Sequence, residues 1–162
     1  MSDLTDKTME MLKYNHHLTK KYQGGLKFGI GNCFAKLVFL ISEFDNEFIY
    51  LLERLLPKFG MEVADVYITP FYKFVGRYSE QKEQNKILLT EIFQTEMLIV
   101  EPYFIVIADE IDLDMPDAYP YERVPELTEI MRLEKELDYD KKTLIKKQKY
   151  ILSRLEEIIN NF

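Results

Sequence analysis

Acidic residues are concentrated in one short stretch of the chain, where they could bind a cation. Five carboxylates lie within nine residues, and they are Asp109, Glu110, Asp112, Asp114 and Asp117. Carboxylate oxygens are the ligands that Mg²⁺ and Ca²⁺ prefer in proteins. The stretch lacks the glycine and the final glutamate of an EF-hand loop, so we interpret it first as a solvated acidic loop. A cation site and an acidic surface for a basic partner are the alternatives.

Two glycines, Gly29 and Gly31, stand just before an apolar segment and resemble part of a dinucleotide-binding loop. Such a loop needs a third small residue, but Phe34 occupies that place. It also needs a repeating strand–helix pattern around it, which the sequence does not show. We therefore predict a plain turn that leads into a helix, and no bound nucleotide or other cofactor.

The residues that most often perform acid–base or nucleophilic chemistry are few. His16 and His17 are adjacent, so on a helix they point about 100° apart and cannot easily share one metal ion. Cys33 is the only cysteine, which excludes an internal disulfide and suits a reducing compartment. The serines Ser2, Ser42, Ser79 and Ser153 lack the strand–turn–helix elbow of hydrolases. The sequence thus predicts no catalytic residue and no metal ligand.

Composition places the chain among folded, soluble proteins. Its 162 residues are 47% hydrophobic, which is enough for one domain with a real core. The formal net charge of −7 disfavours attraction of the whole protein to nucleic acid or to an anionic membrane. The polar N-terminus is unlike a secretory signal, and the apolar run 34–41 is too short to span a membrane. We expect a cytoplasmic protein.

Apolar residues recur at three- and four-residue steps in most of the chain, and this spacing predicts helices. The strongest pattern runs over 33–56, where Pro57 and Gly60 mark the end. Ser79 is expected to cap a helix that ends at Val100. The other predicted helices cover residues 3–22, 125–137 and 140–160.

Two apolar stretches do not distinguish a helix from a strand. A short β element at 61–69 or 103–108 stays open, although a lone strand would lack a pairing partner, which favours helix for 103–108. The predicted fold is mainly α, a bundle of about five to six helices with a long C-terminal helical hairpin or arm. Its parts are a helical core over 1–108, an acidic loop over 109–124 and a charged arm over 125–162.

The C-terminal arm has an apolar stripe and an uneven distribution of charge. Apolar residues repeat every seven positions from Leu137 to Ile158, and further ones widen the stripe to about three positions in seven. That width favours docking on a globular body or in a bundle over a two-stranded coiled coil. Residues 109–140 contain twelve acids and three bases, whereas residues 141–162 contain six bases and two acids. An antiparallel hairpin would bring these opposite charges together.

From these patterns we predict a non-enzymatic protein–protein interaction module, such as an adaptor, a chaperone-like protein or an inhibitor. Its partner is another protein or a second copy of the chain in a homodimer. The predicted partner-binding residues are Lys141, Lys142, Leu144, Lys146, Ile151, Leu155 and Ile158 on the last helix, with Tyr119 and Tyr121 beside the acidic loop. The alternatives are a cation-dependent enzyme that uses the acids of 109–117 and a nucleic-acid-associated regulator that uses the basic face 141–149.

Overall fold

The computed structural model describes residues 2–22, 25–74, 85–115, 118–135 and 140–162, and these residues adopt an α/β fold. A sheet has the strand order β1-β3-β2-β4-β5, in which β1 is antiparallel to β3 and the other neighbours are parallel. The strands are β1 (Ile30–Gly31), β2 (Leu37–Ile41), β3 (Tyr67–Pro70), β4 (Phe104–Ile107) and β5 (Tyr121–Arg123). The prediction of a mainly α helical bundle is therefore wrong, and the described residues form no coiled coil.

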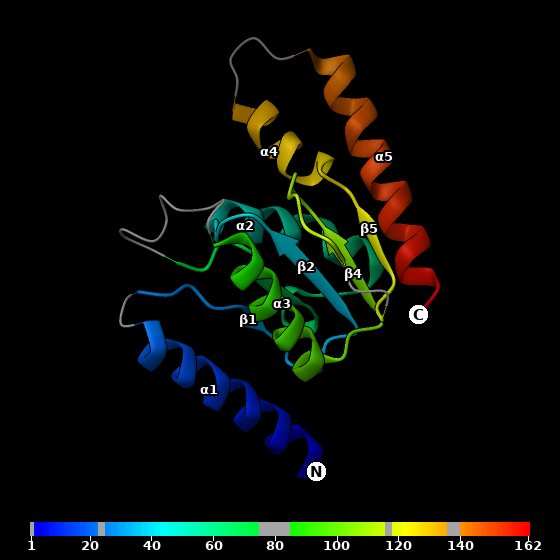
Figure 1. Ribbon diagram of the computed structural model, residues 1–162. Coiled ribbons are helices and arrows are strands. Elements are labelled where there is room, and N and C mark those ends of the chain that lie inside the picture. The colour runs from blue at the N-terminus through cyan, green and yellow to red at the C-terminus, as the bar shows by residue number, and fades with distance from the viewer. Residues whose placement is uncertain (1, 23–24, 75–84, 116–117, 136–139) are drawn as a thin grey trace.

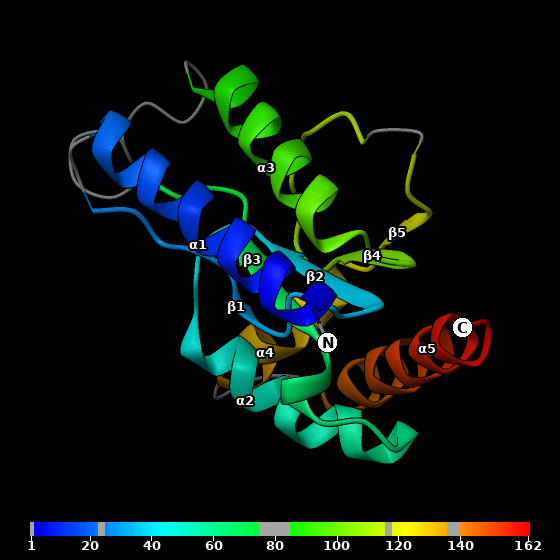
Figure 2. The same ribbon diagram turned by 90° about the horizontal axis from the view of Figure 1, so that it is seen from below.

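Helices cover both faces of this sheet. They are α1 (Ser2–Tyr22), α2 (Asn46–Leu55), α3 (Lys86–Val100), α4 (Glu126–Lys135) and α5 (Lys141–Asn160), with short 3₁₀ turns η1 (Leu56–Phe59) and η2 (Val63–Asp65). Helices α1 and α3 lie on one face, and α2, α4 and α5 lie on the other (Figures 1 and 2). Each layer encloses its own hydrophobic cluster, so the sheet residues divide alternately between two cores.

The single helix predicted over residues 33–56 is in fact strand β2 followed by helix α2. All five residues of β2 are buried, because helices cover both sides of this central strand. A strand buried on both faces has no polar side, so its continuous apolar run matches a helical pattern equally well. The boundary between the two elements is marked by Asp45, whose side chain accepts a hydrogen bond from the Glu47 amide at 2.9 Å and caps α2.

The two ambiguous stretches both contribute strands. Residues 104–107 form β4, so the preference for a helix there was wrong. The partner that seemed missing is β2, which pairs with β4 on one side and with β3 on the other. The stretch 61–69 holds η2 and most of β3, as the open alternative allowed. Tertiary pairing between distant segments decided these elements, which local spacing cannot reveal.

The glycine pair packs against strand β3 and does not lead into a helix as predicted. A Cβ atom on Gly29 would overlap the ring of Tyr67, and one on Gly31 would overlap the carbonyl oxygen of Val66. Gly31 also has a φ of +105°, which residues with side chains rarely adopt. These glycines therefore allow close approach of two strands, which explains them without a phosphate ligand.

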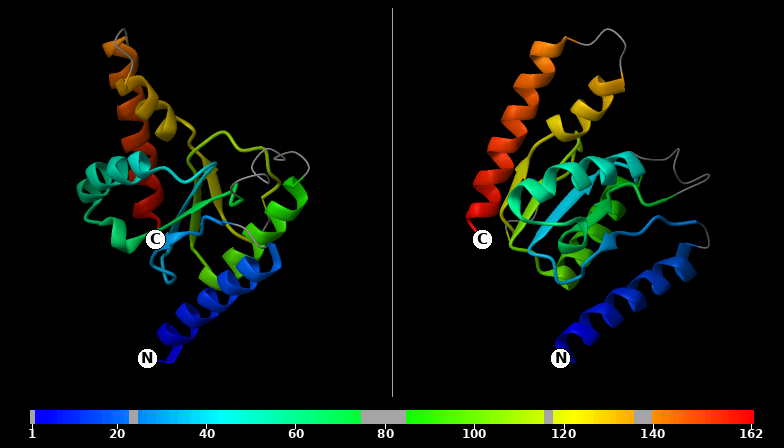
Figure 3. Two further views of the ribbon diagram at one scale, coloured as in Figure 1. Left: turned by 90° about the vertical axis from the view of Figure 1, so that its left-hand side faces the viewer. Right: turned by 180° about the vertical axis from the view of Figure 1, so that it is seen from behind.

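The C-terminal helices α4 and α5 form the predicted hairpin, and their charges pair. Lys147 of α5 contacts Glu129 of α4 at 2.5 Å, and Arg154 pairs with Glu122 of β5. The apolar residues of α5 are buried against the sheet together with α2 and α4. Figure 3 shows the first turns of α5 extending beyond the sheet.

Helix α3 begins at Lys86 in the structure, while the predicted cap Ser79 lies outside the described residues. A short turn follows it, and β4 then begins at Phe104.

In the part of the chain that the structure describes, none of the helices combines the length and the apolar character needed to cross a membrane.

Leu155 tests whether α5 is docked in solution. Its side chain is completely buried, so Leu155→Ala should lower the free energy of unfolding by about 2–5 kcal/mol. Lys149→Ala, on the exposed side of the same helix, should change it by less than about 0.5 kcal/mol. Urea denaturation followed by circular dichroism measures both. Equal, small effects of the two substitutions would contradict the docked helix.

Candidate functional site

The topology of the sheet points to one edge as the place for a ligand. The chain leaves β2 toward β3 on one side, whereas it leaves β4 toward β5 on the other side. In open parallel sheets, ligands bind outside the carboxyl ends of the strands, in the crevice where the connections diverge in this way. Here that crevice lies beyond Ile41 of β2 and Ile107 of β4, which are neighbouring strands.

Three segments meet in this crevice at the carboxylate of Asp109. Ser42, directly after β2, donates its hydroxyl hydrogen to Oδ2 of Asp109. Oδ1 accepts hydrogen bonds from the amide of Glu110 at 2.8 Å and from the hydroxyl of Thr128, in the first turn of α4, at 3.2 Å. The carboxylate is thus fixed by the ends of two strands and the start of a helix. Neither Ser42 nor Thr128 was predicted from the sequence to belong to a site.

Asp109 separates two adjoining cavities, each of about 270 Å³. One cavity has an apolar side formed by Ile41, Phe44, Phe48 and Met131 and a polar side formed by Ser42, Glu43, Asp45, Asp109 and Thr128. The buried ring of Phe48 packs edge-on against Phe39, with ring centres 6.1 Å apart. The other cavity is more polar and is lined by Asp109, Glu110, Pro125, Thr128, Glu129 and Arg132.

The crevice is acidic. Its walls contain five carboxylates, at Glu43, Asp45, Asp109, Glu110 and Glu129, and one cationic side chain, Arg132. Asp45 is engaged as the cap of α2, and Glu129 pairs with Lys147. The walls thus carry more negative than positive charge, which favours ligands that are cationic or rich in hydrogen-bond donors.

The carboxylate of Asp109 can accept a hydrogen bond from a ligand in addition to those that it accepts from the protein. A carboxylate offers about four lone-pair positions, and three donors reach this one. The hydroxyl of Thr128 has one hydrogen and lies within hydrogen-bond distance of both Asp109 and the carbonyl oxygen of Pro125, at 3.2 and 3.1 Å, so it can donate to only one of them at a time. An N–H or O–H group in the cavity can therefore bond to Asp109. A carboxylate in this place can also accept a proton from a bound group, which is the role of a general base.

Of the other acids of the predicted loop, Glu110 lines the polar cavity beside Asp109, whereas Asp112 lines neither cavity. Asp112 extends outward and pairs with Lys86 at 2.5 Å, which holds the pKa of that carboxyl below its usual range. Arg123 fixes the segment by donating to the carbonyl oxygens of Ile111 and Leu113 at 2.6 and 2.9 Å. Asp117 lies outside the described residues. Among those described, no group of three acid, histidine or cysteine side chains is arranged to hold a metal ion.

The predicted partner-binding residues are distributed over both faces of the molecule. The apolar ones on α5, which are Leu144, Ile151, Leu155 and Ile158, are buried inside the chain, whereas Lys141, Lys142 and Lys146 are exposed. Tyr119 packs on the opposite side of the sheet and donates its hydroxyl hydrogen to the carbonyl oxygen of Met97 at 3.2 Å. Tyr121 is 45% exposed on the edge strand β5. The structure does not bring the two tyrosines and the lysines together.

The histidines and the cysteine lie away from the crevice residues. His16 and His17 are both on the exposed side of α1. Cys33 is half-buried in the turn before β2, and not in a helix as predicted. Burial and the nearby carboxylate of Glu96 raise the pKa of its thiol, so little reactive thiolate forms at neutral pH.

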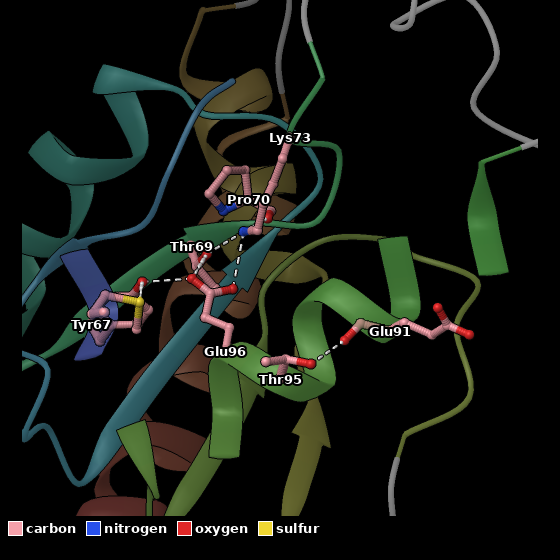
Figure 4. Close-up of polar contacts among 8 residues, drawn as sticks. Tyr67, Thr69, Pro70, Lys73, Glu91, Thr95 and Glu96 are labelled. Atoms are coloured by element: carbon pink, nitrogen blue, oxygen red, sulfur yellow. Dashed lines mark hydrogen bonds and ion pairs between the residues drawn. The ribbon is translucent and has the colours of Figure 1, made fainter. Parts of the chain in front are cut away.

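A buried polar network that the sequence analysis missed lies on the α3 side of β3 (Figure 4). Lys73 and Glu96 form an ion pair at 3.0 Å with side chains only 2% and 4% exposed. Lys73 also donates to the Thr69 hydroxyl at 2.7 Å and to the Pro70 carbonyl oxygen at 2.6 Å. The other carboxylate oxygen of Glu96 accepts hydrogen bonds from Tyr67 at 2.5 Å and Thr69 at 2.7 Å.

Two groups of this network, Lys73 and Tyr67, have shifted pKa values. Burial lowers the pKa of Lys73, and the attraction of Glu96 opposes that effect. Burial and the negative charge of Glu96 raise the pKa of Tyr67 far above its usual value. One signal in the sequence could have revealed the network, because Glu96 stands in the apolar stripe of its helix, next to Phe93, Met97 and Val100.

Comparison with known protein families and with curated proteins finds no match to this chain. The class of protein that the fold and the crevice define is an α/β protein with a candidate ligand site at the carboxyl edge of its parallel strands.

Tyr67 should make the protein less stable at alkaline pH. Its folded-state pKa lies above the unfolded value of about 10, so its contribution is present below pH 10 and is lost as the pH rises above it. The loss approaches about 1.4 kcal/mol per pH unit for one group. Urea unfolding between pH 9 and 11 should therefore show a shallower decline for Tyr67→Phe than for the wild type. Lys73 is present in both proteins, so a difference between the two slopes comes from Tyr67. Equal slopes would contradict the raised pKa of Tyr67.

Proposed function

We propose that this protein binds a small planar molecule that carries N–H donors, in the crevice at the carboxyl ends of β2 and β4. The observation that supports the proposal is the carboxylate of Asp109, which three segments fix in place while leaving it accessible from two cavities. Preorganised polar groups of this kind, few in number and set against an apolar wall, are typical of small-molecule sites.

The chemistry of the ligand is inferred from the two sides of the Ser42–Phe48 cavity. Phe44, which is partly exposed, offers aromatic surface on which a flat ring can pack, and the buried ring of Phe48 lies in the wall behind it. Asp109 opposite them can accept a charge-assisted hydrogen bond, which is stronger than a bond between neutral groups. Amidines and amino-substituted heterocycles combine a flat apolar ring with such donors, and a volume of about 270 Å³ limits them to small members of that class.

Benzamidine is a suitable probe, because it joins a phenyl ring to a planar cation with four N–H donors. We expect Asp109→Asn to weaken benzamidine binding by about 10- to 100-fold, which corresponds to one lost hydrogen bond to a charged group. Isothermal titration calorimetry measures the dissociation constant. Benzoate, which is equally flat but anionic, should not bind.

The matched control is Asp112→Asn, which removes a carboxylate from the same loop but outside both cavities. That variant should bind benzamidine as the wild type does. If the wild type does not bind the probe, or if the two asparagine variants lose affinity equally, the crevice is not the site.

A second candidate function rests on the exposed side of α5. Lys141, Lys142, Lys146 and Lys149 are exposed there, and Ile145 lies among them with half its surface exposed. Lys147, by contrast, pairs with Glu129. Lysines near the N-terminus of a helix oppose its dipole, which suggests that they serve a purpose other than helix stability. We propose this face as a docking surface for an acidic protein segment, from another protein or a second copy of the chain.

Reversing charges on this face tests the docking surface. Lys142→Glu, Lys146→Glu and Lys149→Glu combined should abolish binding of a fluorescent glutamate-rich peptide, measured by anisotropy at low salt, because unlike charges become like charges. Reversal of Lys13, Lys20 and Lys21 on α1 is the control and should leave binding intact. Equal loss in both variants would show non-specific attraction only. Preference for single-stranded DNA over the peptide would favour the nucleic-acid alternative.

For the compartment we propose the cytoplasm, and the single free thiol of Cys33 supports that proposal.

A further inference from the structure

We propose that the buried pair Lys73–Glu96 positions Ser42, and through Ser42 the carboxylate of Asp109, for ligand binding. The inference rests on the proposed function of the crevice. Neither residue of the pair lines the described cavities around Asp109. Their effect on a ligand would therefore be transmitted through the backbone, which makes them positioning residues.

The first step of the connection is between α3 and the end of β3. Glu96 projects from α3 toward the sheet and meets Lys73, which lies three residues beyond β3 (Figure 4). Lys73 turns back to bond with the Thr69 hydroxyl and the Pro70 carbonyl oxygen. These bonds fold residues 69–73 into a closed loop of polar contacts and attach that loop to the helix.

The second step is between this loop and β2. The amides of Phe71 and Tyr72 donate to the carbonyl oxygens of Ile41 and Ser42, at 2.8 and 2.9 Å. The pairing of β3 with β2 thus continues past the end of β3, along the segment that Lys73 holds. Ser42 is the residue whose hydroxyl bonds to Asp109, so hydrogen bonds joined by short stretches of backbone connect Glu96 with the crevice.

A charged pair suits this task better than an apolar contact. Burying two charges costs free energy that only good geometry and further hydrogen bonds recover. Lys73 donates to two fixed acceptors and forms an ion pair with Glu96, and Glu96 accepts hydrogen bonds from Tyr67 and Thr69. Such a network has one favourable arrangement, whereas apolar side chains can slide past one another. The end of β3 is consequently held in one position relative to α3.

A double-mutant cycle between Glu96→Gln and Ser42→Ala tests the inference, with benzamidine as the probe. Glu96→Gln should weaken binding at least tenfold in the otherwise wild-type protein. In the Ser42→Ala background, Glu96→Gln should weaken binding less than twofold, because the hydroxyl of Ser42, through which Glu96 acts on Asp109, is absent. Independent, multiplying losses from the two substitutions would overturn the proposal, since a general loss of stability acts equally in both backgrounds.

Thr69→Val is a milder second variant in case Glu96→Gln does not fold. It removes the hydroxyl that bridges Lys73 and Glu96 but keeps the ion pair, so we expect a threefold to tenfold loss of affinity that again disappears with Ser42→Ala. Ile158→Ala is the control, because Ile158 is buried at the far end of α5. Its affinity for benzamidine should equal that of the wild type. An equal loss in Ile158→Ala and Thr69→Val would also overturn the proposal.

Hydrogen exchange of the Tyr72 amide provides a readout without any ligand. If the wild type fails to bind benzamidine, the proposed ligand site has failed, and exchange alone then decides the role of the pair. Thr69→Val or Glu96→Gln should speed exchange of the Tyr72 amide at least tenfold relative to amides in α5, measured by NMR. Ile158→Ala should not produce this difference. Uniform acceleration throughout the chain would overturn the positioning role.

Discussion

Both faces of the central strand β2 are buried, and each face is a surface on which one helical layer packs. Its five residues alternate between the two hydrophobic clusters, with Val38 and Leu40 facing α1 and α3 and with Leu37, Phe39 and Ile41 facing the other layer. A parallel sheet requires cover on both faces. Docking of α5 is therefore part of the fold itself, because α5 supplies Ile151 and Leu155 to the cover of one face. The crevice exists because this buried strand ends between two diverging connections.

The two faces of the sheet are closed by different kinds of interaction. The face that carries α2, α4 and α5 has an apolar interior, and its ion pairs lie at the margin, as with Lys147 and Glu129. The face that carries α1 and α3 includes the fully buried Lys73 and Glu96 beside apolar side chains. Apolar packing gives most of the stability of such a protein, whereas a buried polar network selects one arrangement among several compact ones. The network stands next to the carboxyl edge, which is where a ligand site needs fixed geometry.

The sequence predicts the outer elements of this fold better than its centre. The amphipathic helices over 3–22, 125–137 and 140–160 agree closely with α1, α4 and α5, since each has one polar side and produces a clear period. Strands β2 and β4 have no polar side, and their pairing joins residues more than sixty positions apart, which no local pattern encodes. The candidate site could be predicted only in part for the same reason. Asp109 belongs to the acidic cluster that the sequence shows, whereas Ser42 and Thr128 are brought to it only by the sheet.

The edges of the sheet have a consequence for behaviour at high concentration. The outer strands are very short, with two residues in β1 and three in β5, and β5 presents the charged side chains of Glu122 and Arg123. An edge strand with many free amide and carbonyl groups is a template on which other molecules add strands and aggregate. Each edge strand of this sheet offers few such groups. In the edge strand β1, Gly31 has a positive φ, which departs from strand geometry. The sheet is thus unsuited to growth by addition of further chains, although its centre is among the most apolar segments of the sequence.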